Sequence, residues 1–274
     1  MIAYFYDCRI TETDSSFFSA RGKIHVVKYA LISDIHANLP ALEAVLADID
    51  RRAEGGAIYH LGDLVGYAPW PNETIELIRQ RGIAGIAGNY DSTTGTGYKH
   101  CGCKYEDAHQ EELSHLSYGW TREHATPETK RFLAGLPFRL DLWPRGGHVS
   151  GGPRVILVHG TPTLNTLYWT EDRPDSFCSQ MAGIAGAKPG DVIAFGHTHK
   201  PWHRVVEGVH FLNTGSVGKP KDGDWRAGYV RLSLGQETPQ FEFMRVEYDI
   251  ERAMKGIRDS ELPDEFADQL RTGG

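Results

Sequence analysis

The chain contains few cysteines for its length. Four of its 274 residues are cysteine: Cys8, Cys101, Cys103 and Cys178. Domains that depend on a disulfide framework are short and much richer in cysteine, so this scattered set does not indicate one. Reduced thiols are the normal state in the cytoplasm, and we therefore expect a cytoplasmic protein.

Long hydrophobic runs and a secretory leader are also missing. No stretch approaches the ~18 apolar residues of a membrane-spanning helix, and we expect no membrane partner. Residues 1–27 lack a basic start, an apolar core and a small-residue cleavage site. They show no sustained period, so we predict an N-terminal extension that is disordered or reflects a misassigned start, since valine codons, as at Val26 or Val27, can begin bacterial translation.

An excess of positive charge is likewise absent. The chain has 36 acidic and 29 basic residues, and its formal net charge is −7. A protein that neutralises many nucleic-acid phosphates needs a surplus of lysine and arginine. Bulk nucleic acid is therefore not an expected partner, whereas the sequence leaves the oligomeric state open.

What is present is an alternation of strand and helix patterns. Apolar runs at 29–33, 57–61 and 83–87 are separated by helical periodicity, which predicts a parallel sheet flanked by helices. A mainly helical insertion is expected at about 95–152, and strands at 154–158 and 191–195 then resume the pattern.

The pattern of predicted elements changes after residue 199. Four strand patterns follow without intervening helices and predict an antiparallel second sheet: 202–206, 209–213, 228–234 and 240–248. A helix is expected to begin at Asp249, and a short polar helix closes the chain. No internal repeat or linker divides residues 28–274, so we predict one composite α/β domain with two sheets face to face.

Potential metal ligands follow five successive predicted strands. The carboxyl ends of such strands are where binding sites collect in α/β sheets. Seven side chains occupy these positions: Asp34, His36, Asp63, Asn89, His159, His197 and His199. Two carboxylates, one amide oxygen and four imidazoles exceed the needs of one tetrahedral ion but suit two ions with Asp63 between them.

A pair of ions in such a site lowers the pKa of a shared water and clamps the oxygens on both sides of a phosphorus atom. The sequence therefore predicts hydrolysis of a phosphoester by a hydroxide that bridges two metal ions. Mixed imidazole and carboxylate ligands accept Mn, Fe, Zn, Co or Ni, and Mn is the choice for an assay.

Five motifs in fixed order resemble a known family. SDIHAN, GDLVGY, GNYD, VHG and GHTH, within residues 29–218, are similar to the signature of the calcineurin-like metallophosphoesterases, which reads D-x-H, G-D, G-N-H-D/E, H and G-H-x-H. The chain looks most like the bacterial branch related to diadenosine tetraphosphatases and serine/threonine protein phosphatases.

The resemblance implies a four-layer α-β-β-α sandwich with mixed sheets and the metal site at strand carboxyl ends. It also divides the ligands between the ions. Asp63 would be shared, one ion would take Asp34, His36 and His199, and the other would take the rest: Asn89, His159 and His197.

One position departs from the family pattern. Tyr90 stands where relatives have a histidine that protonates the leaving group with help from the next acid, here Asp91. A phenol with a pKa of about 10 is a poor general acid at neutral pH, so we assign Tyr90 to orienting the substrate. This favours small substrates with good leaving groups: phosphodiesters, phosphoanhydrides, nucleotides among them, or activated monoesters.

The sequence leaves alternatives for the function and for the roles of several residues. A noncatalytic scaffold that keeps the fold is the alternative to an enzyme, although a scaffold would be free to lose ligands and none is missing. Asn38 is expected to cap a helix. Asn213 and Ser216 either hydrogen-bond to a ligand histidine or form a simple turn. For Lys219, surface charge is favoured over contact with a substrate phosphate.

Overall fold

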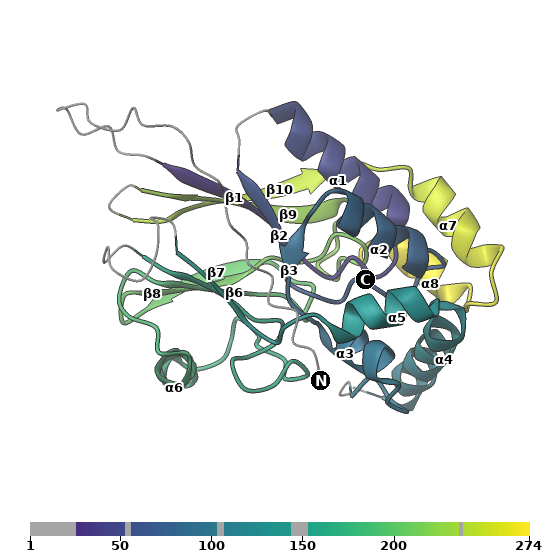
Figure 1. The fold of residues 1–274 in the computed structure, drawn as a ribbon, viewed down its shortest axis with the longest axis horizontal. Helices are drawn as coiled ribbons and strands as arrows, with labels where there is room; N and C mark the ends of the chain where they lie inside the picture. Colours follow the sequence, from purple (N-terminus) through teal and green to yellow (C-terminus); the bar gives the residue numbers. More distant parts are fainter. Residues whose placement is uncertain (1–25, 53–55, 103–106, 144–152, 236–237) are drawn as a thin grey trace.

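Two five-stranded sheets pack face to face at the centre of the molecule (Figure 1). The computed structural model describes residues 26–52, 56–102, 107–143, 153–235 and 238–274. In these ranges, helices cover the outer face of each sheet, which gives the layer order helix, sheet, sheet, helix. The predicted four-layer sandwich with mixed sheets is confirmed.

The first sheet has the strand order β10-β9-β1-β2-β3. Its strands are β1 (Val27–Ile32), β2 (Ala57–His60), β3 (Ala84–Gly85), β9 (Ala227–Leu234) and β10 (Gln240–Val246). β1, β2 and β3 run parallel, whereas β9 pairs antiparallel with both β1 and β10. The parallel part carries the first three predicted ligand loops.

The second sheet has the strand order β4-β5-β6-β8-β7. Its strands are β4 (Leu140–Leu142), β5 (Val155–Leu157), β6 (Val192–Phe195), β7 (Trp202–Val206) and β8 (Val209–Asn213). β5, β6 and β8 are parallel, and β4 and β7 are antiparallel edge strands.

The expected arrangement of the C-terminal strands was wrong. They do not form a sheet of their own: β7 and β8 extend the sheet of β5 and β6, whereas β9 and β10 cross to the sheet of β1. The alternation of polar and apolar residues along a strand indicates which side chains are buried. It does not indicate which other strand will pair with that strand. That choice depends on contacts between distant segments.

Three hydrophobic clusters hold the layers together. One fills the space between the sheets, with Leu31 and Leu61 from the first and Leu157 and Leu212 from the second. A second lies under the helices that cover the first sheet: α1 (Leu39–Arg52), α2 (Pro71–Gln80), α7 (Ile250–Arg258) and α8 (Glu265–Thr272). The third packs α6 (Asp175–Ala185) on the second sheet.

The remaining helices lie at one end of the sandwich (Figure 1). They are α3 (Asn89–Thr96), α4 (Ala108–His124) and α5 (Pro127–Ala134). The last two fall inside the predicted insertion, which also supplies edge strand β4. The predicted N-terminal extension lies outside the described residues except for Val26 and Val27, and β1 already begins at Val27.

The helix starts predicted at Asn38 and Asp249 are both observed with side-chain caps. Asn38 accepts a hydrogen bond from the Ala41 amide at 3.3 Å, so the expected cap of α1 is confirmed. Asp249 accepts from the Arg252 amide at 2.9 Å and begins α7 as expected. The closing helix α8 is less polar than expected, since it buries Phe266, Ala267 and Leu270.

Candidate metal centre

The predicted ligands sit in tight loops at the carboxyl ends of the strands. Five of them adopt a left-handed backbone, with φ between 49° and 66°: Asp34, His36, Asp63, His197 and His199. Residues other than glycine rarely adopt this conformation, and where it occurs in clusters the surrounding structure must compensate for its cost. Backbone strain is therefore concentrated at these loops.

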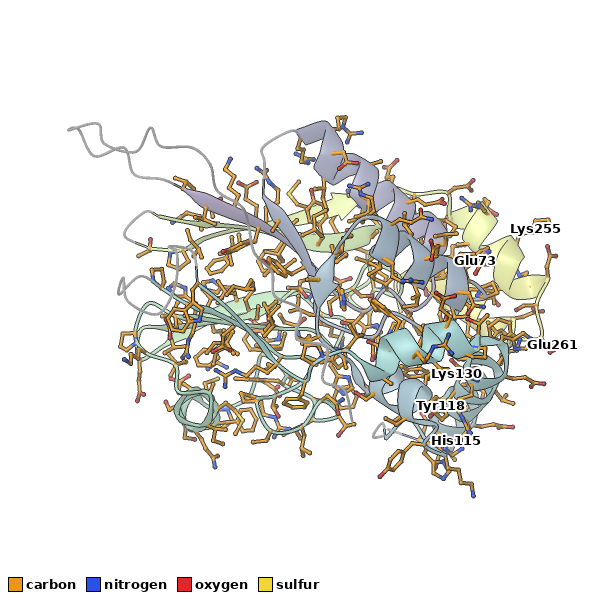
Figure 2. The ribbon with its side chains drawn as sticks, viewed as in Figure 1. Glu73, His115, Tyr118, Lys130, Lys255 and Glu261 are labelled. Carbon is orange, nitrogen blue, oxygen red and sulfur yellow. The ribbon has the colours of Figure 1, made fainter. Side chains whose placement is uncertain are left out.

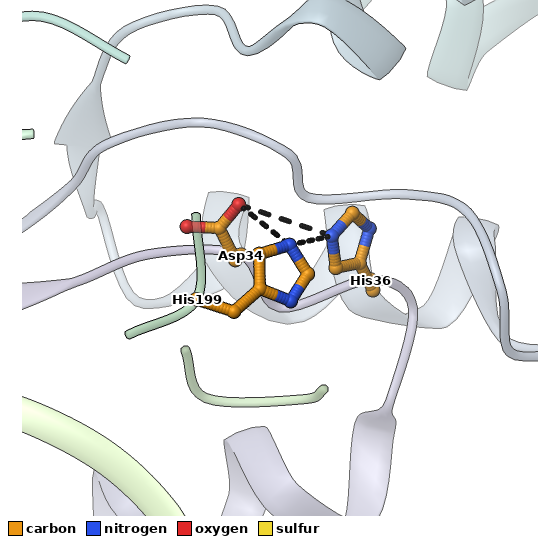
Figure 3. Close-up of side chains that lie close together, drawn as sticks. All are labelled: Asp34, His36 and His199. Carbon is orange, nitrogen blue, oxygen red and sulfur yellow. Dashed lines mark hydrogen bonds and ion pairs between the residues drawn. The ribbon is translucent and has the colours of Figure 1, made fainter. Parts of the chain in front are cut away.

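One group of ligands joins the loop after β1 to the loop after β6. Figure 3 shows Asp34, His36 and His199 with their side chains converging, and the ligand atoms of all three lie within 4.8 Å of one another. His199 Nε2 is 3.3 Å from Asp34 Oδ1, and His36 Nε2 is 3.8 Å from the same oxygen. All three side chains are buried.

A second group joins the loops after β2, β5 and β6. Asp63, His159 and His197 place their ligand atoms within 4.8 Å of one another, and all are buried. Asp63 also faces the first group, because its Oδ2 lies 3.4 Å from His159 Nε2 and 3.8 Å from His36 Nε2. Asp63 is thus the carboxylate between the two groups.

Backbone carbonyls fix the orientation of three imidazole rings. The Nδ1 atom of His36 donates to Val65 O at 3.0 Å, that of His159 donates to Leu61 O at 2.7 Å, and that of His199 donates to Lys219 O at 2.5 Å. A ring that donates from Nδ1 presents the lone pair of Nε2 to the other side. This is the arrangement found for histidines that bind metals.

The resulting lone pairs fit a bound cation. His36 Nε2 and His199 Nε2 face each other at 3.1 Å, which is repulsive for two acceptors unless a cation or a proton lies beside them. Within the described ranges, the buried atoms Asp34 Oδ1, His159 Nε2 and His197 Nε2 have no hydrogen-bond partner. Unsatisfied buried acceptors in one place indicate a site made for positive ions.

Burial and mutual charge set the protonation of the centre. Burial lowers the pKa of His36 and of His197 to about 3, and a neighbouring histidine acts in the same direction in each case. Burial is the largest single influence on His159 and acts to lower its pKa, but the charge and hydrogen bond of Asp63, the charge of Asp34 and the hydrogen bond to Leu61 O together outweigh it and raise this pKa to about 10. Without a metal ion, His159 Nε2 would therefore carry a proton that faces the Asp63 carboxylate and stands in the place of a cation.

We expect metal binding to release that proton. Because His159 must be neutral to bind an ion, a proton competes with the metal at every pH below about 10. Affinity for the Mn²⁺ ion that His159 binds should accordingly tighten about 100-fold between pH 6 and pH 8, because one proton leaves His159 when that ion binds. Titration of the metal-free protein at several pH values measures this, and an affinity independent of pH would contradict it.

Asn89 begins α3 beside the second group. Its Nδ2 donates to Cys101 O at 3.3 Å, which directs the amide so that the oxygen is the atom suited to a metal. The next residue ties this end of α3 to the centre, because the Tyr90 amide donates to Asp63 Oδ1 at 2.9 Å.

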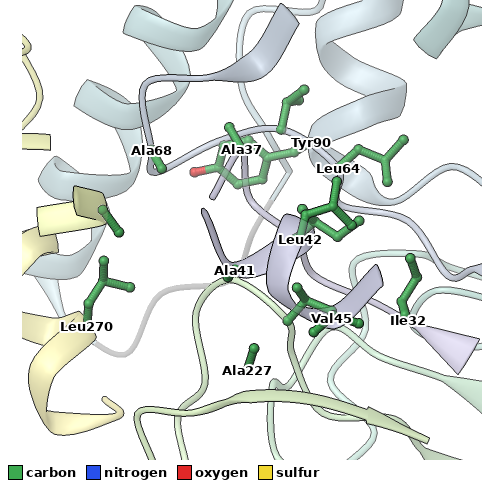
Figure 4. Packing of buried hydrophobic residues seen from close by; sticks show 14 of the residues in the cluster. Ile32, Ala37, Ala41, Leu42, Val45, Leu64, Ala68, Tyr90, Ala227 and Leu270 are labelled. Carbon is green, nitrogen blue, oxygen red and sulfur yellow. The ribbon is translucent and has the colours of Figure 1, made fainter. Parts of the chain in front are cut away.

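The Tyr90 side chain points into the protein. It is 1% exposed and lies in the apolar cluster with Ala37, Leu64 and Ala68 (Figure 4). Its hydroxyl lies 3.3 Å from the hydroxyl of Ser114 on α4, and its ring is 5.7 Å from the ring of His36. The Tyr90 ring therefore packs against the His36 ring and helps to hold it in position.

Asp91 links two of the ligand loops. Its Oδ1 accepts from the Leu64 amide and its Oδ2 from the Gly88 amide, both at 2.9 Å. Burial and then the charge of Asp63 raise its pKa to about 7. Both oxygens are therefore engaged in holding the loops after β2 and β3 together.

Two tyrosines that contact ligand histidines were not predicted from the sequence. Tyr67 packs edge-on against His36 with ring centroids 4.9 Å apart, and Tyr168 stacks on His197 at 4.4 Å. Tyr67 belongs to the GDLVGY motif, so proximity in sequence to Asp63 was an available signal. Tyr168 lies in an irregular loop with no such signal.

Asn213 and Ser216 form hydrogen bonds to the ligand loops. Asn213 donates to Gly196 O at 2.8 Å and to Thr198 Oγ1 at 2.9 Å, which braces the loop that carries the last two histidines. Ser216 donates to Asp34 O at 2.7 Å. Both residues thus stabilise the loops, and none of these three bonds is made to an imidazole ring.

Paired Asp/His groups at the carboxyl ends of strands from two packed sheets form a site that could hold metal ions. A family profile described as the calcineurin-like phosphoesterase superfamily domain matches residues 27–237. The chain belongs to this superfamily, and membership indicates metal-dependent hydrolysis of phosphoesters.

Similar proteins cover almost the whole chain. An uncharacterized protein of Methanocaldococcus jannaschii is 32% identical over 265 residues, which are 89% of this chain and 97% of that protein. A metallophosphoesterase from Sphaerobacter thermophilus has a similar structure, with a TM-score of 0.68 and 27% identity over 91% of this chain and 100% of that one.

A hypothetical protein from Pyrococcus horikoshii OT3 shares the fold, with a TM-score of 0.75 and 24% identity over 90% of this chain and 99% of that one. Within the described ranges, none of the helices has both the length and the apolar character needed to cross a bilayer.

Proposed function

We propose that the chain hydrolyses a phosphoester by attack of a hydroxide held between two divalent metal ions. Asp34, His36 and His199 with Asp63 would hold one ion, and Asp63 with three further side chains would hold the other: Asn89, His159 and His197. The observation that carries this proposal is the position of Asp63, whose Oδ2 lies within 3.8 Å of a histidine nitrogen from each group.

The charge of the site favours a phosphate ligand. When bound, two divalent ions would supply Lewis acidity and lower the pKa of a shared water. Their charge of +4 exceeds the −2 of Asp34 and Asp63, so a positive site would lie inside a protein whose net charge is −7. A negatively charged phosphoryl group is attracted to such a site.

The position of Tyr90 bears on the leaving group. A phenol that is buried against Ser114 is a poor source of a proton for an alkoxide. We therefore propose that Tyr90 supports His36, in place of the substrate-orienting role expected from the sequence. Substrates that need little protonation of the leaving group are then favoured: small phosphodiesters, phosphoanhydrides or activated aryl esters, nucleotides included.

A panel assay tests the proposal. The metal-free protein is supplied with Mn²⁺, Fe²⁺, Zn²⁺, Co²⁺ or Ni²⁺ and offered a bis-aryl phosphate, an aryl monophosphate, an unactivated alkyl monophosphate, cyclic nucleotides and dinucleoside polyphosphates. We expect hydrolysis that requires metal, stops with a chelator and is slow on unactivated alkyl monoesters. A protein that binds no metal and cleaves none of these substrates would instead be the noncatalytic scaffold.

A further inference from the structure

His197 differs from the other three predicted histidine ligands in how its ring is held. Each of those three rings donates from Nδ1 to a backbone oxygen. The ring of His197 forms no hydrogen bond with any described residue, and its Nε2 is a buried atom without a partner. The amide of His197 donates to Asp34 Oδ2 at 3.0 Å, which fixes the main chain but does not set the rotation of the ring about the Cβ–Cγ bond, a soft torsion in histidine.

Tyr168 restricts that rotation by stacking on the ring. The two ring centroids lie 4.4 Å apart, and the ring planes are 15° from parallel. The His159 ring meets His197 edge-on, with centroids 5.0 Å apart and an angle of 62°. Turning the imidazole out of its plane would drive it into the tyrosine ring, and stacked aromatic rings also attract each other. Tyr168 therefore takes the part that a backbone oxygen takes for the other three histidines.

The residues around Tyr168 hold it at this place. Trp169 is fully buried, and its ring stacks on Phe195 with centroids 4.5 Å apart and planes 8° from parallel. Phe195 ends β6, two residues before His197. Two neighbouring residues of the loop between β5 and α6 therefore form two stacked pairs with the end of β6 and the turn after it. Arg173 donates a further bond to Tyr168 O at 3.3 Å.

We propose that Tyr168 is a positioning residue, whose ring holds the His197 imidazole in the orientation that binds a metal ion together with Asp63. This inference rests on the proposed two-ion centre. Removing a group that orients a metal ligand typically costs roughly 10- to 100-fold in metal affinity. Because stacking uses the flat ring, phenylalanine should be able to replace tyrosine at this position, whereas a side chain without a ring should not.

The experiment titrates Mn²⁺ into the metal-free protein and its variants by calorimetry. The wild type should bind two ions per chain. We expect Tyr168→Ala to weaken the binding of one of them by roughly tenfold or more, and Tyr168→Phe to change it by less than about twofold. Tyr168→Leu fills much of the same space without a flat ring and should also weaken binding, so the test does not depend on the alanine variant alone. With Mn²⁺ at saturation, each variant should keep the wild-type KM for bis-4-nitrophenyl phosphate, because Tyr168 acts on a metal ligand and not on the substrate.

His124→Ala is the matched control. The His124 ring stacks on Trp120 with centroids 3.9 Å apart and planes 11° from parallel, but His124 is not a predicted ligand. It is exposed on α4, the helix that also carries His115 and Tyr118 (Figure 2). This variant should bind Mn²⁺ as the wild type does. Wild-type metal binding by Tyr168→Ala, equal losses in the alanine and phenylalanine variants, or a raised KM with unchanged metal binding would each refute the positioning role while the metal centre stands. A wild type that binds no metal would instead refute the proposed centre itself.

Discussion

Replacing Asp63 with asparagine is expected to abolish most of the turnover while leaving the fold intact. Asparagine keeps an oxygen that can accept from the Tyr90 amide, now at 2.9 Å, but removes the negative charge between the two ligand groups. Metal ions stabilise the charge of the transition state by several kcal/mol, and each 1.4 kcal/mol is a factor of ten. We therefore expect kcat/KM for a bis-aryl phosphate to fall at least about 1,000-fold.

Two measurements accompany this test. The metal content of Asp63→Asn should drop below that of the wild type, and its thermal unfolding should stay cooperative. Asp268→Asn is the control, because Asp268 is an exposed carboxylate on α8 that pairs with Arg258. A variant at Asp63 that keeps full turnover and full metal content would contradict the shared role of this carboxylate.

Gly196→Ala should disable the centre by a purely steric route. A Cβ atom on Gly196 would lie 2.0 Å from Ser33 Oγ and 2.3 Å from Asp34 Oδ2, far inside contact distance. Asp34 is held there by bonds from the Ser33 hydroxyl at 2.5 Å and the His197 amide at 3.0 Å, so it has little room to move aside. We expect a loss of about 1–3 kcal/mol of stability from overpacking.

Activity should suffer more than stability in this variant. Misplacing a catalytic group by about 1 Å can cost roughly 100-fold in rate, so we expect a loss of that size or more in kcat/KM. Gly183→Ala is the matched control: this glycine lies in α6 with open space where a Cβ would be. It should keep full activity and gain about 0.5–1 kcal/mol, because alanine favours a helix interior. Equal activity of the two variants would contradict the tight fit around Asp34.

Contacts within the protein hold the predicted ligands in place. Backbone carbonyls orient three imidazole rings. The amides of Leu64 and Gly88 hold Asp91. The side chains of Asn213 and Ser216 hold the ligand loops in place. Fixed ligands need little reorganisation when ions bind, which strengthens binding and preserves the geometry of the reaction. The strained backbone at five ligand positions fits this interpretation.

The sequence alone was enough to predict the α/β class and the places where chemistry collects. Period and spacing located β1, β2, β6 and the caps at Asn38 and Asp249, because these depend on neighbours within a few residues. The order of ligand residues after successive strands predicted the shared edge of the sheets, since parallel strands end on the same side.

Tertiary structure decided what depends on distant partners. It sent β9 and β10 to the sheet of β1, turned the Tyr90 hydroxyl toward α4, and buried Lys219 under α8. None of these outcomes has a local signature, because pairing and burial result from contacts between segments that lie far apart along the chain. Local sequence therefore determined which groups reach the site, and the packing of remote elements determined how each of them is held.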